Sequence, residues 1–229
     1  MVRASILYIE GPWFESMHIH PMLSIEQSPI FEAAKKYYDP RLPYHNWDHV
    51  MQTVAASREI IQNCLAEGIK VRPYFVYHCD AFHDADYIKD HLSLGFSSKE
   101  ALSVSIAEYE FRKFNFVESY IAEVKQGIMS TNQTAPFDTI EQKVIRASDL
   151  ASMAGDYETF KRNNLLLKLE TEMLTGNTFT LDEWKERTKN TINFYLSQNI
   201  HLTKKYSDKD GNSVFHTNTR KNLDKFLTS

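Results

Sequence analysis

The sequence predicts an all-α fold, and three observations lead to that prediction. Glycine and proline are sparse, with seven of each in 229 residues, which favours long helices over a fold rich in turns. Apolar residues recur at helical spacing, as Val50, Val54, Ile61 and Leu65 do. No segment shows a convincing alternation with a period of two, which a half-buried strand would require. We therefore expect a single-domain helical bundle.

Breakers and capping residues place the helices of the N-terminal half. Residues 1–24 are expected to be irregular, and Ser28-Pro29 is typical of a helix start. Asp39–Pro43, with its two prolines, predicts an extended loop before the next helix. Ser97 and Glu100 have the spacing of a capping box. The helices expected here cover residues 28–38, 46–66, 73–87, 98–114 and 117–130.

Similar signals place the helices of the C-terminal half. Asp138 or Thr139 begins a helix that Gly155 interrupts, and Thr180 with Glu183 begins another. The helices expected here cover residues 138–154, 156–174, 180–199 and 219–228, with a turn over 207–214. Residues 28–200 or thereabouts then form the core, and residues 201–229 form a C-terminal extension of the single domain, 1–229.

Charge and composition exclude several classes of function. The net charge is −4 and the pI is near 6.1, which disfavours an extended surface for nucleic acid or for an anionic membrane. No apolar run approaches the roughly 20 residues that span a bilayer. The two cysteines are too few for a disulfide framework and fit a reducing compartment. We expect a cytoplasmic protein.

Histidines and acids fall on three separate segments. His45 and His49 are four residues apart, so they share a helix face and could both serve one metal, or one could bind metal while the other reaches a substrate. His83 and Asp84 lie in an apolar segment, where polar groups need partners or a metal. Asp149 lies in a helix of apolar and small residues and needs either a metal or a salt bridge to Arg146.

In order and spacing, His49, His83-Asp84 and Asp149 resemble the H…HD…D pattern of the HD superfamily of metal-dependent phosphohydrolases. Local segments are similar to a small family usually described as predicted HD-superfamily phosphohydrolases. The resemblance covers about residues 30–228. The segments that carry it are YHNWDH (44–49), AFHDADY (81–87), SSKEALS (97–103), RASDLASMAG (146–155) and TRKNLDKFL (219–227).

The resemblance implies an HD-type helical bundle in which His49, His83, Asp84 and Asp149 bind one divalent metal. Two imidazoles and two carboxylates suit Zn²⁺, Mn²⁺, Fe²⁺, Co²⁺ or Ni²⁺, with Mg²⁺ also possible. Metal-activated water would then hydrolyse a phosphoester bond of a nucleotide or a similar small phosphorylated metabolite. By the same resemblance, His45 is expected to protonate the leaving group.

Further residues are candidates for catalysis or for substrate contact. Glu100 could orient or deprotonate the attacking water, or it could serve only in the capping box. Tyr44, Asn46, Arg146 and Arg162 could contact substrate, although an exposed arginine such as Arg162 is common on helices. Residues 131–134 lack the histidine that relatives often have before the last aspartate, which favours a single metal.

Two other classes of function stay open at this stage. The same scaffold could be a catalytically inactive module that binds a metal or a nucleotide. Alternatively, the histidines and acids could form internal salt bridges in a helical structural protein. The sequence decides neither the substrate nor the oligomeric state.

Overall fold

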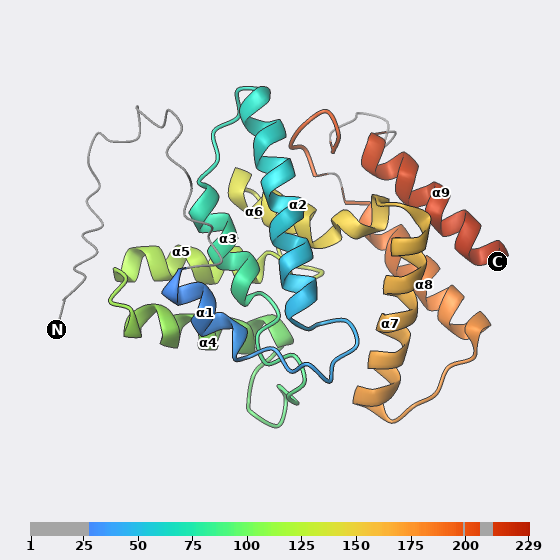
Figure 1. Cartoon of the computed structure of the whole chain (residues 1–229), viewed down its shortest axis with the longest axis horizontal. Coiled ribbons are helices and arrows are strands. Elements are labelled where there is room, and N and C mark those ends of the chain that lie inside the picture. The colour runs from blue at the N-terminus through green and yellow to red at the C-terminus, as the bar shows by residue number, and fades with distance from the viewer. Residues whose placement is uncertain (1–27, 199, 207–212) are drawn as a thin grey trace.

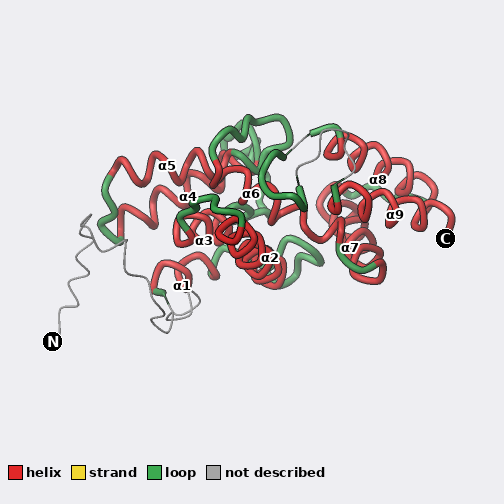
Figure 2. The backbone as a smooth tube through the Cα atoms, turned by 90° about the horizontal axis from the view of Figure 1, so that it is seen from above, coloured by secondary structure: helices red, strands yellow, loops and turns green. Residues whose placement is uncertain are grey.

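The computed structural model describes residues 28–198, 200–206 and 213–229. Along these residues the chain is all-helical, as predicted, and Figure 2 shows only helices and loops. The predictions for residues 1–24 and for most of the 207–214 turn lie outside the described ranges. The helices are α1 (Pro29–Lys35), α2 (Trp47–Ala66), α3 (Pro73–Phe82), α4 (Lys99–Lys113), α5 (Glu118–Met129), α6 (Ile140–Leu150), the 3-10 helix η3 (Ala151–Ala154), α7 (Tyr157–Thr175), α8 (Leu181–Leu196) and α9 (Val214–Thr228).

Side-chain caps explain why several helices begin where they do. Ser28 and Asn46 accept hydrogen bonds from the first turns of α1 and α2. Thr139 forms a capping box with Gln142 at the start of α6, and Thr180 forms the expected one at α8. These caps confirm most of the predicted helix starts.

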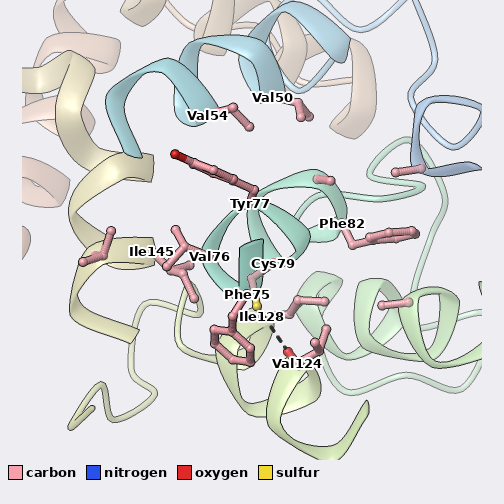
Figure 3. Packing of buried hydrophobic residues seen from close by; sticks show 14 of the residues in the cluster. Val50, Val54, Phe75, Val76, Tyr77, Cys79, Phe82, Val124, Ile128 and Ile145 are labelled. Carbon is pink, nitrogen blue, oxygen red and sulfur yellow. Dashed lines mark hydrogen bonds between the residues drawn. The ribbon is translucent and has the colours of Figure 1, made fainter. Parts of the chain in front are cut away.

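Helix α3 is the centre of the fold. It packs against α1, α2, α4, α5 and α6, and residues 75–82 are all buried. A helix that is buried all round has to be apolar on every face, which its sequence largely satisfies. In Figure 3, Val50 and Val54 of α2 lie above α3, Ile145 of α6 lies beside it, and Val124 of α5 lies below.

A second, smaller apolar cluster lies at one end of the molecule. Figure 1 shows α7, α8 and α9 grouped at one end, with α4 and α5 at the other. Met153 and Leu196 pack against both clusters and join them. The buried members of the smaller cluster are Phe160, Trp184, Ile192, Leu223 and Phe226.

Several predicted boundaries were wrong, among them the end of the helix predicted over 180–199, which ends at Leu196. The helix that begins at Pro73 ends at Phe82 rather than Tyr87, because Asp86 adopts a left-handed backbone (φ 59°) and its N–H donates to Tyr37 O. The first helix ends at Lys35, and the last begins at Val214 instead of residue 219.

The predicted capping box at residues 97–100 was also wrong. Ser98, not Ser97, caps α4, and its hydroxyl accepts from Ala101 N at 3.1 Å. The residue three positions after the cap is therefore an alanine, which has no side-chain acceptor. Glu100 lies in the first turn of α4 and is free for another role.

Gly127 lets α5 approach α3 closely. A Cβ at this position would lie 2.5 Å from Cys79 Sγ and 3.2 Å from Phe75 Cζ. We expect Gly127→Ala to lower the free energy of unfolding by about 1–2 kcal/mol, because overpacking outweighs the gain in helix propensity. Urea denaturation measures this.

A double variant supplies the control for the glycine prediction. Cys79→Ala removes the sulfur that the new methyl group would meet, so Gly127→Ala should cost less in that background. Equal costs in both backgrounds would show that the contact with Cys79 is not the cause.

Candidate metal centre

Three elements bring His49, His83 and Asp149 together in the interior. His49 is in the first turn of α2, His83 directly follows α3, and Asp149 is near the end of α6. Because α2 packs against α3 and α6, one ligand atom from each residue lies within 4.8 Å of the others. The two histidines are buried. His49, His83 and Asp149 can therefore hold a metal ion.

Asp84, the fourth predicted ligand, lies against the same group. Its Oδ2 is 2.8 Å from His83 Nε2 and 3.4 Å from His49 Nε2. Asp149 Oδ1 lies 3.6 Å and 3.4 Å from the same two nitrogens. Ligands about 2.0–2.2 Å from a metal are roughly 3 Å from their neighbours at octahedral angles, so the distances from both carboxylates to the histidines suit such an ion. The group whose ligand atoms all lie within 4.8 Å of one another is His49, His83 and Asp149, without Asp84.

The orientation of His83 leaves its Nε2 free to bind a metal. Its Nδ1 lies 2.7 Å from Asp80 O, and a carbonyl oxygen only accepts, so Nδ1 carries the proton. In the neutral ring, Nε2 then has a lone pair. His83 Nε2 faces His49 Nε2 at 3.2 Å, so a proton or a metal cation is needed between the rings.

The carboxylates favour positive charge at this centre. Burial alone would lower the pKa of His83, but Asp84 and Asp149 outweigh it and raise the pKa well above its usual range. Burial would raise the pKa of Asp149, yet hydrogen bonds with His49 and His83 lower it. A divalent cation can replace the protons that the two imidazoles would otherwise hold.

Asn46 fixes the start of the helix that carries His49. Its Oδ1 accepts from the backbone N–H groups of Asp48 and His49, and its Nδ2 donates to Leu42 O. The carboxamide is thus already used by the backbone. Asn46 also lines the cavity described below. Its predicted contact with substrate therefore has to be made by the part of the side chain that faces this cavity.

His45 lies beside the donor group and is oriented by two neighbours. Its Nε2 is 4.0 Å from Asp84 Oδ2, while its Nδ1 makes a short hydrogen bond with Glu170 of α7. Glu170 also accepts from the backbone N–H groups of Tyr44 and His45, each at 2.8 Å. Tyr87 stacks on the imidazole, with centroids 3.7 Å apart and planes 13° apart.

Glu170 is a buried acid that stays ionised. Burial would raise the pKa of its carboxyl, but the hydrogen bond and the charge of His45 lower it. Neither Glu170 nor Tyr87 was predicted from the sequence to be part of this site. A signal for Glu170 was present, because it is seven residues after Asn163 and ten after Phe160, and therefore shares the inward face of α7.

Arg146 was predicted to contact substrate, but its guanidinium is committed to the protein. The side chain is fully buried, and Nη1 lies 2.7–3.0 Å from three successive carbonyl oxygens, those of residues 130–132. Nη2 donates to Gln133 O and Gln198 Oε1. These contacts tie the end of α5 and the following turn to α6. They replace the predicted pairing of Arg146 with Asp149 or with a substrate.

The remaining candidates are distributed around the centre. Glu100 accepts from Asn132 Nδ2 at 3.0 Å. The Tyr44 ring contacts both His45, in the loop before α2, and His49, in α2. Its centroid lies 4.8 Å from that of His45 and 4.6 Å from that of His49. Arg162 is exposed on α7 and lines a cavity with Tyr44, Asn46 and His49.

Three further polar residues close in sequence to His83 and Asp84 have partners within the protein. His78 Nδ1 lies 2.7 Å from Tyr120 Oη, and burial lowers the pKa of His78 to about 4. Asp86 pairs with Lys89 at 2.6 Å. Asp80 is buried, and burial raises its pKa to about 7 despite hydrogen bonds from Ser57 and Ser148.

Comparison with known proteins gives no match to this site. No protein-family model matches the chain, and no curated protein matches it. Within the described ranges, no helix is long and apolar enough to cross a bilayer. The function therefore has to be argued from the donor atoms and from what surrounds them.

Proposed function

We propose that the protein is a metal-dependent phosphohydrolase that acts on a nucleotide or a similar small phosphorylated metabolite. Its metal ligands are His49, His83, Asp84 and Asp149. The observation that supports this best is the convergence of these four donors, from α2, from α6 and from the residues that follow α3. The two histidine Nε2 atoms lie 3.2 Å apart, and each lies 2.8–3.6 Å from an oxygen of Asp84 and of Asp149. The resemblance to HD-type sequences supports the same reaction.

The donor set selects the kind of metal. Two imidazole nitrogens with two carboxylate oxygens suit Zn²⁺, Mn²⁺, Fe²⁺, Co²⁺ or Ni²⁺, whereas Ca²⁺ prefers oxygen ligands alone. Such an ion, when bound, acidifies water and offsets the charge of a phosphoryl group. One divalent ion satisfies both carboxylates, because each contributes one negative charge.

In this proposal, His45 is the general acid. Glu170 accepts the proton of its Nδ1, and Tyr87 fixes the plane of the ring, so Nε2 points toward Asp84. A proton on Nε2 can pass to the leaving oxygen of a phosphoester bound at the centre. Glu170 acts through His45, because its carboxylate stabilises the imidazolium and holds its orientation.

Glu100 is proposed to orient the attacking water. It is not part of a capping box, and its carboxylate is directed by Asn132. Burial is the main cause of the raised pKa of Tyr87, and the negative charges of Asp84, Glu170 and Glu100 add to it, so Glu100 is one of the acids near Tyr87. A carboxylate in that position can accept a proton from water.

The pairing of His45 with Glu170 makes a specific prediction for Glu170→Gln. A neutral amide still hydrogen-bonds to His45 but stabilises its charge less, so we expect kcat to fall about 10²-fold while metal content stays unchanged. Steady-state kinetics and metal analysis of the same preparation measure the two quantities.

Glu172→Gln is the matched control for Glu170→Gln. Glu172 is on the same helix but pairs with Lys168, away from His45. A loss of metal in Glu170→Gln, or an equal loss of kcat in Glu172→Gln, would contradict the role given to Glu170.

The direct test of the function begins with metal analysis of the purified protein. A screen of nucleotides and of an aryl phosphate then follows, with Mn²⁺, Co²⁺, Ni²⁺ and Mg²⁺ added separately. We expect a bound transition metal and phosphate release. Metal-free protein whose thermal stability does not change on metal addition would overturn the proposal. Specific nucleotide binding without turnover would favour the inactive binding module instead.

A further inference from the structure

A small cavity opens beside His49, between the start of α2 and the face of α7. Its volume is about 270 Å³, slightly below the usual range of roughly 300–1,000 Å³ for small-molecule sites. That size suits a compact organic group rather than a polymer. The lining residues are Pro43, Tyr44, Asn46, Asp48, His49, Gln52, Arg162, Asn163 and Leu166.

The cavity is lined by polar groups that have no partner among the described residues. Asn163 is only 5% exposed, and its Nδ2 has no hydrogen-bond acceptor among the described residues. Leaving such a donor unpaired is costly, so an acceptor supplied by a ligand would be stabilising. Gln52 and Arg162 are exposed, and neither is bonded to another residue in the part of the chain that the structure describes.

We propose that this cavity binds the organic part of the substrate, and that the substrate carries a second anionic group. This inference rests on the proposed function, because His49 belongs both to the cavity and to the metal centre. Asn163 Nδ2 donates to an acceptor atom of the organic group. The Arg162 guanidinium pairs with the second anion, a phosphate or a carboxylate.

The other lining residues limit the ligand further. Leu166 and Pro43 offer apolar contact, which suits a ring or a short carbon chain. Asp48 adds a carboxylate to the same lining and disfavours a group that is anionic throughout. The substrate class is therefore a small phosphoester with one further anionic group and a neutral, hydrogen-bonding body.

Matched phosphoesters test the inference. Glycerol 2-phosphate and 2-phosphoglycerate differ in one carboxylate, and adenosine 5′-monophosphate and adenosine 3′,5′-bisphosphate differ in one phosphate. We expect the wild type to favour the doubly anionic member of at least one pair. Arg162→Gln should raise KM about 10-fold more for that member than for its partner. Asn163→Ala should lower kcat/KM for both members.

Lys221→Gln is the control, because it removes one exposed positive charge on α9, outside the cavity lining. The inference is overturned if the wild type favours neither member of either pair, or if Lys221→Gln matches the effect of Arg162→Gln. Absence of any hydrolysis, including that of p-nitrophenyl phosphate, would overturn the proposed function instead. In that case, calorimetry would measure the binding of the same pairs to Mn²⁺-treated protein. Tighter binding of the doubly anionic member, lost in Arg162→Gln, would still support the cavity inference, and equal binding of both members of each pair would overturn it.

A different set of contacts supports a second inference, about Asp80. This carboxylate is fully buried on α3 and bonds to Ser57 Oγ of α2 and Ser148 Oγ of α6. Helices α2 and α6 each also carry a proposed metal ligand, and His83 directly follows α3. Ser57 is two helical turns after His49, and Ser148 directly precedes Asp149. The backbone carbonyl of Asp80 in turn accepts from His83 Nδ1 at 2.7 Å.

We infer that Asp80 is a positioning residue for the metal centre, which again rests on the proposed function. Its two carboxylate oxygens hold α2 and α6 against α3, so the spacing of the donors depends on these bonds. Groups that orient metal ligands typically affect metal affinity about 10- to 100-fold. A core carboxylate without this role would affect stability alone.

Metal affinity and stability, measured separately, test the role of Asp80. We expect Asp80→Ala and Ser57→Ala to raise the Kd for Mn²⁺ about 10-fold or more in calorimetry. Asp80→Asn should recover most of the affinity, because an amide can bond to both hydroxyls. Phe226→Leu, in the smaller apolar cluster, is the control and should lower stability without changing Kd.

The outcomes separate the two proposals. A wild-type Kd in both Asp80→Ala and Ser57→Ala would overturn the positioning role. If Asp80→Ala does not fold, the Kd for Mn²⁺ of Ser57→Ala and of Asp80→Asn decides. A raised Kd in Ser57→Ala with a nearly unchanged Kd in Asp80→Asn would support the positioning role, and a wild-type Kd in Ser57→Ala would overturn it. A wild type that binds no metal would overturn the proposed function.

Discussion

Asp84→Ala is expected to lower phosphoester hydrolysis about 10³-fold or more and to weaken metal binding. The substitution removes an oxygen that lies 2.8 Å from His83 Nε2 and 3.4 Å from His49 Nε2. Loss of the ion would remove several kcal/mol of transition-state stabilisation, which corresponds to at least that factor in rate. Elemental analysis and steady-state kinetics of the purified variant measure both effects.

Asp86→Asn is the control for this prediction. Asp86 is two residues away and also acidic, but it pairs with Lys89. Asparagine tolerates its left-handed backbone, so the variant should keep the fold. We expect its metal content and activity to match those of the wild type. Full activity in Asp84→Ala, or equal losses in the two variants, would contradict the assignment of the ligands.

Arg146→Met is expected to lower the free energy of unfolding by about 3–5 kcal/mol. The substitution removes a donor from four backbone carbonyl oxygens, and among the described residues those of Ser130 and Thr131, both buried, have no other donor. The carbonyl oxygens of Asn132 and Gln133 still accept from Ala135 N and Gln198 Nε2. It also removes the guanidinium that lies over Phe137 and Tyr195. Urea denaturation, with a check that the slope of the transition is unchanged, measures the loss.

Arg112→Met is the matched control for Arg146→Met. Arg112 is about half exposed and pairs with Glu108 and Glu118 at the surface, so its loss should cost at most about 1 kcal/mol. If Arg146 acted mainly on substrate, Arg146→Met would change KM and leave stability close to that of Arg112→Met. That result would restore the original interpretation of this residue.

The sequence predicted those features that depend on neighbouring residues. Asn46 and Ser28 could be recognised as helix starts because a cap acts within its own first turn. The burial of α3 also followed from its apolar residues. The end of α3 could not be predicted, since the contact from Asp86 N to Tyr37 O joins residues 49 positions apart.

The same distinction, between features set by neighbouring residues and features set by long-range contacts, applies to the candidate site. Its histidines and aspartates could be named because each is an unusual polar residue in an apolar or aromatic setting. Glu170 could not be placed beside His45, because 125 residues separate them and only the packing of α7 sets their distance. Arg146 was misinterpreted for a related reason, since its acceptors are backbone carbonyls, which leave no mark in the sequence.

The enclosure of α3 by five other helices has a consequence for motion at the centre. Amide hydrogens of a helix with no exposed face exchange with solvent only when the surrounding helices separate, so those of residues 76–82 should exchange last. His83 directly follows this segment and is anchored to it by the carbonyl of Asp80. Local fluctuations are therefore expected to leave His83 in place.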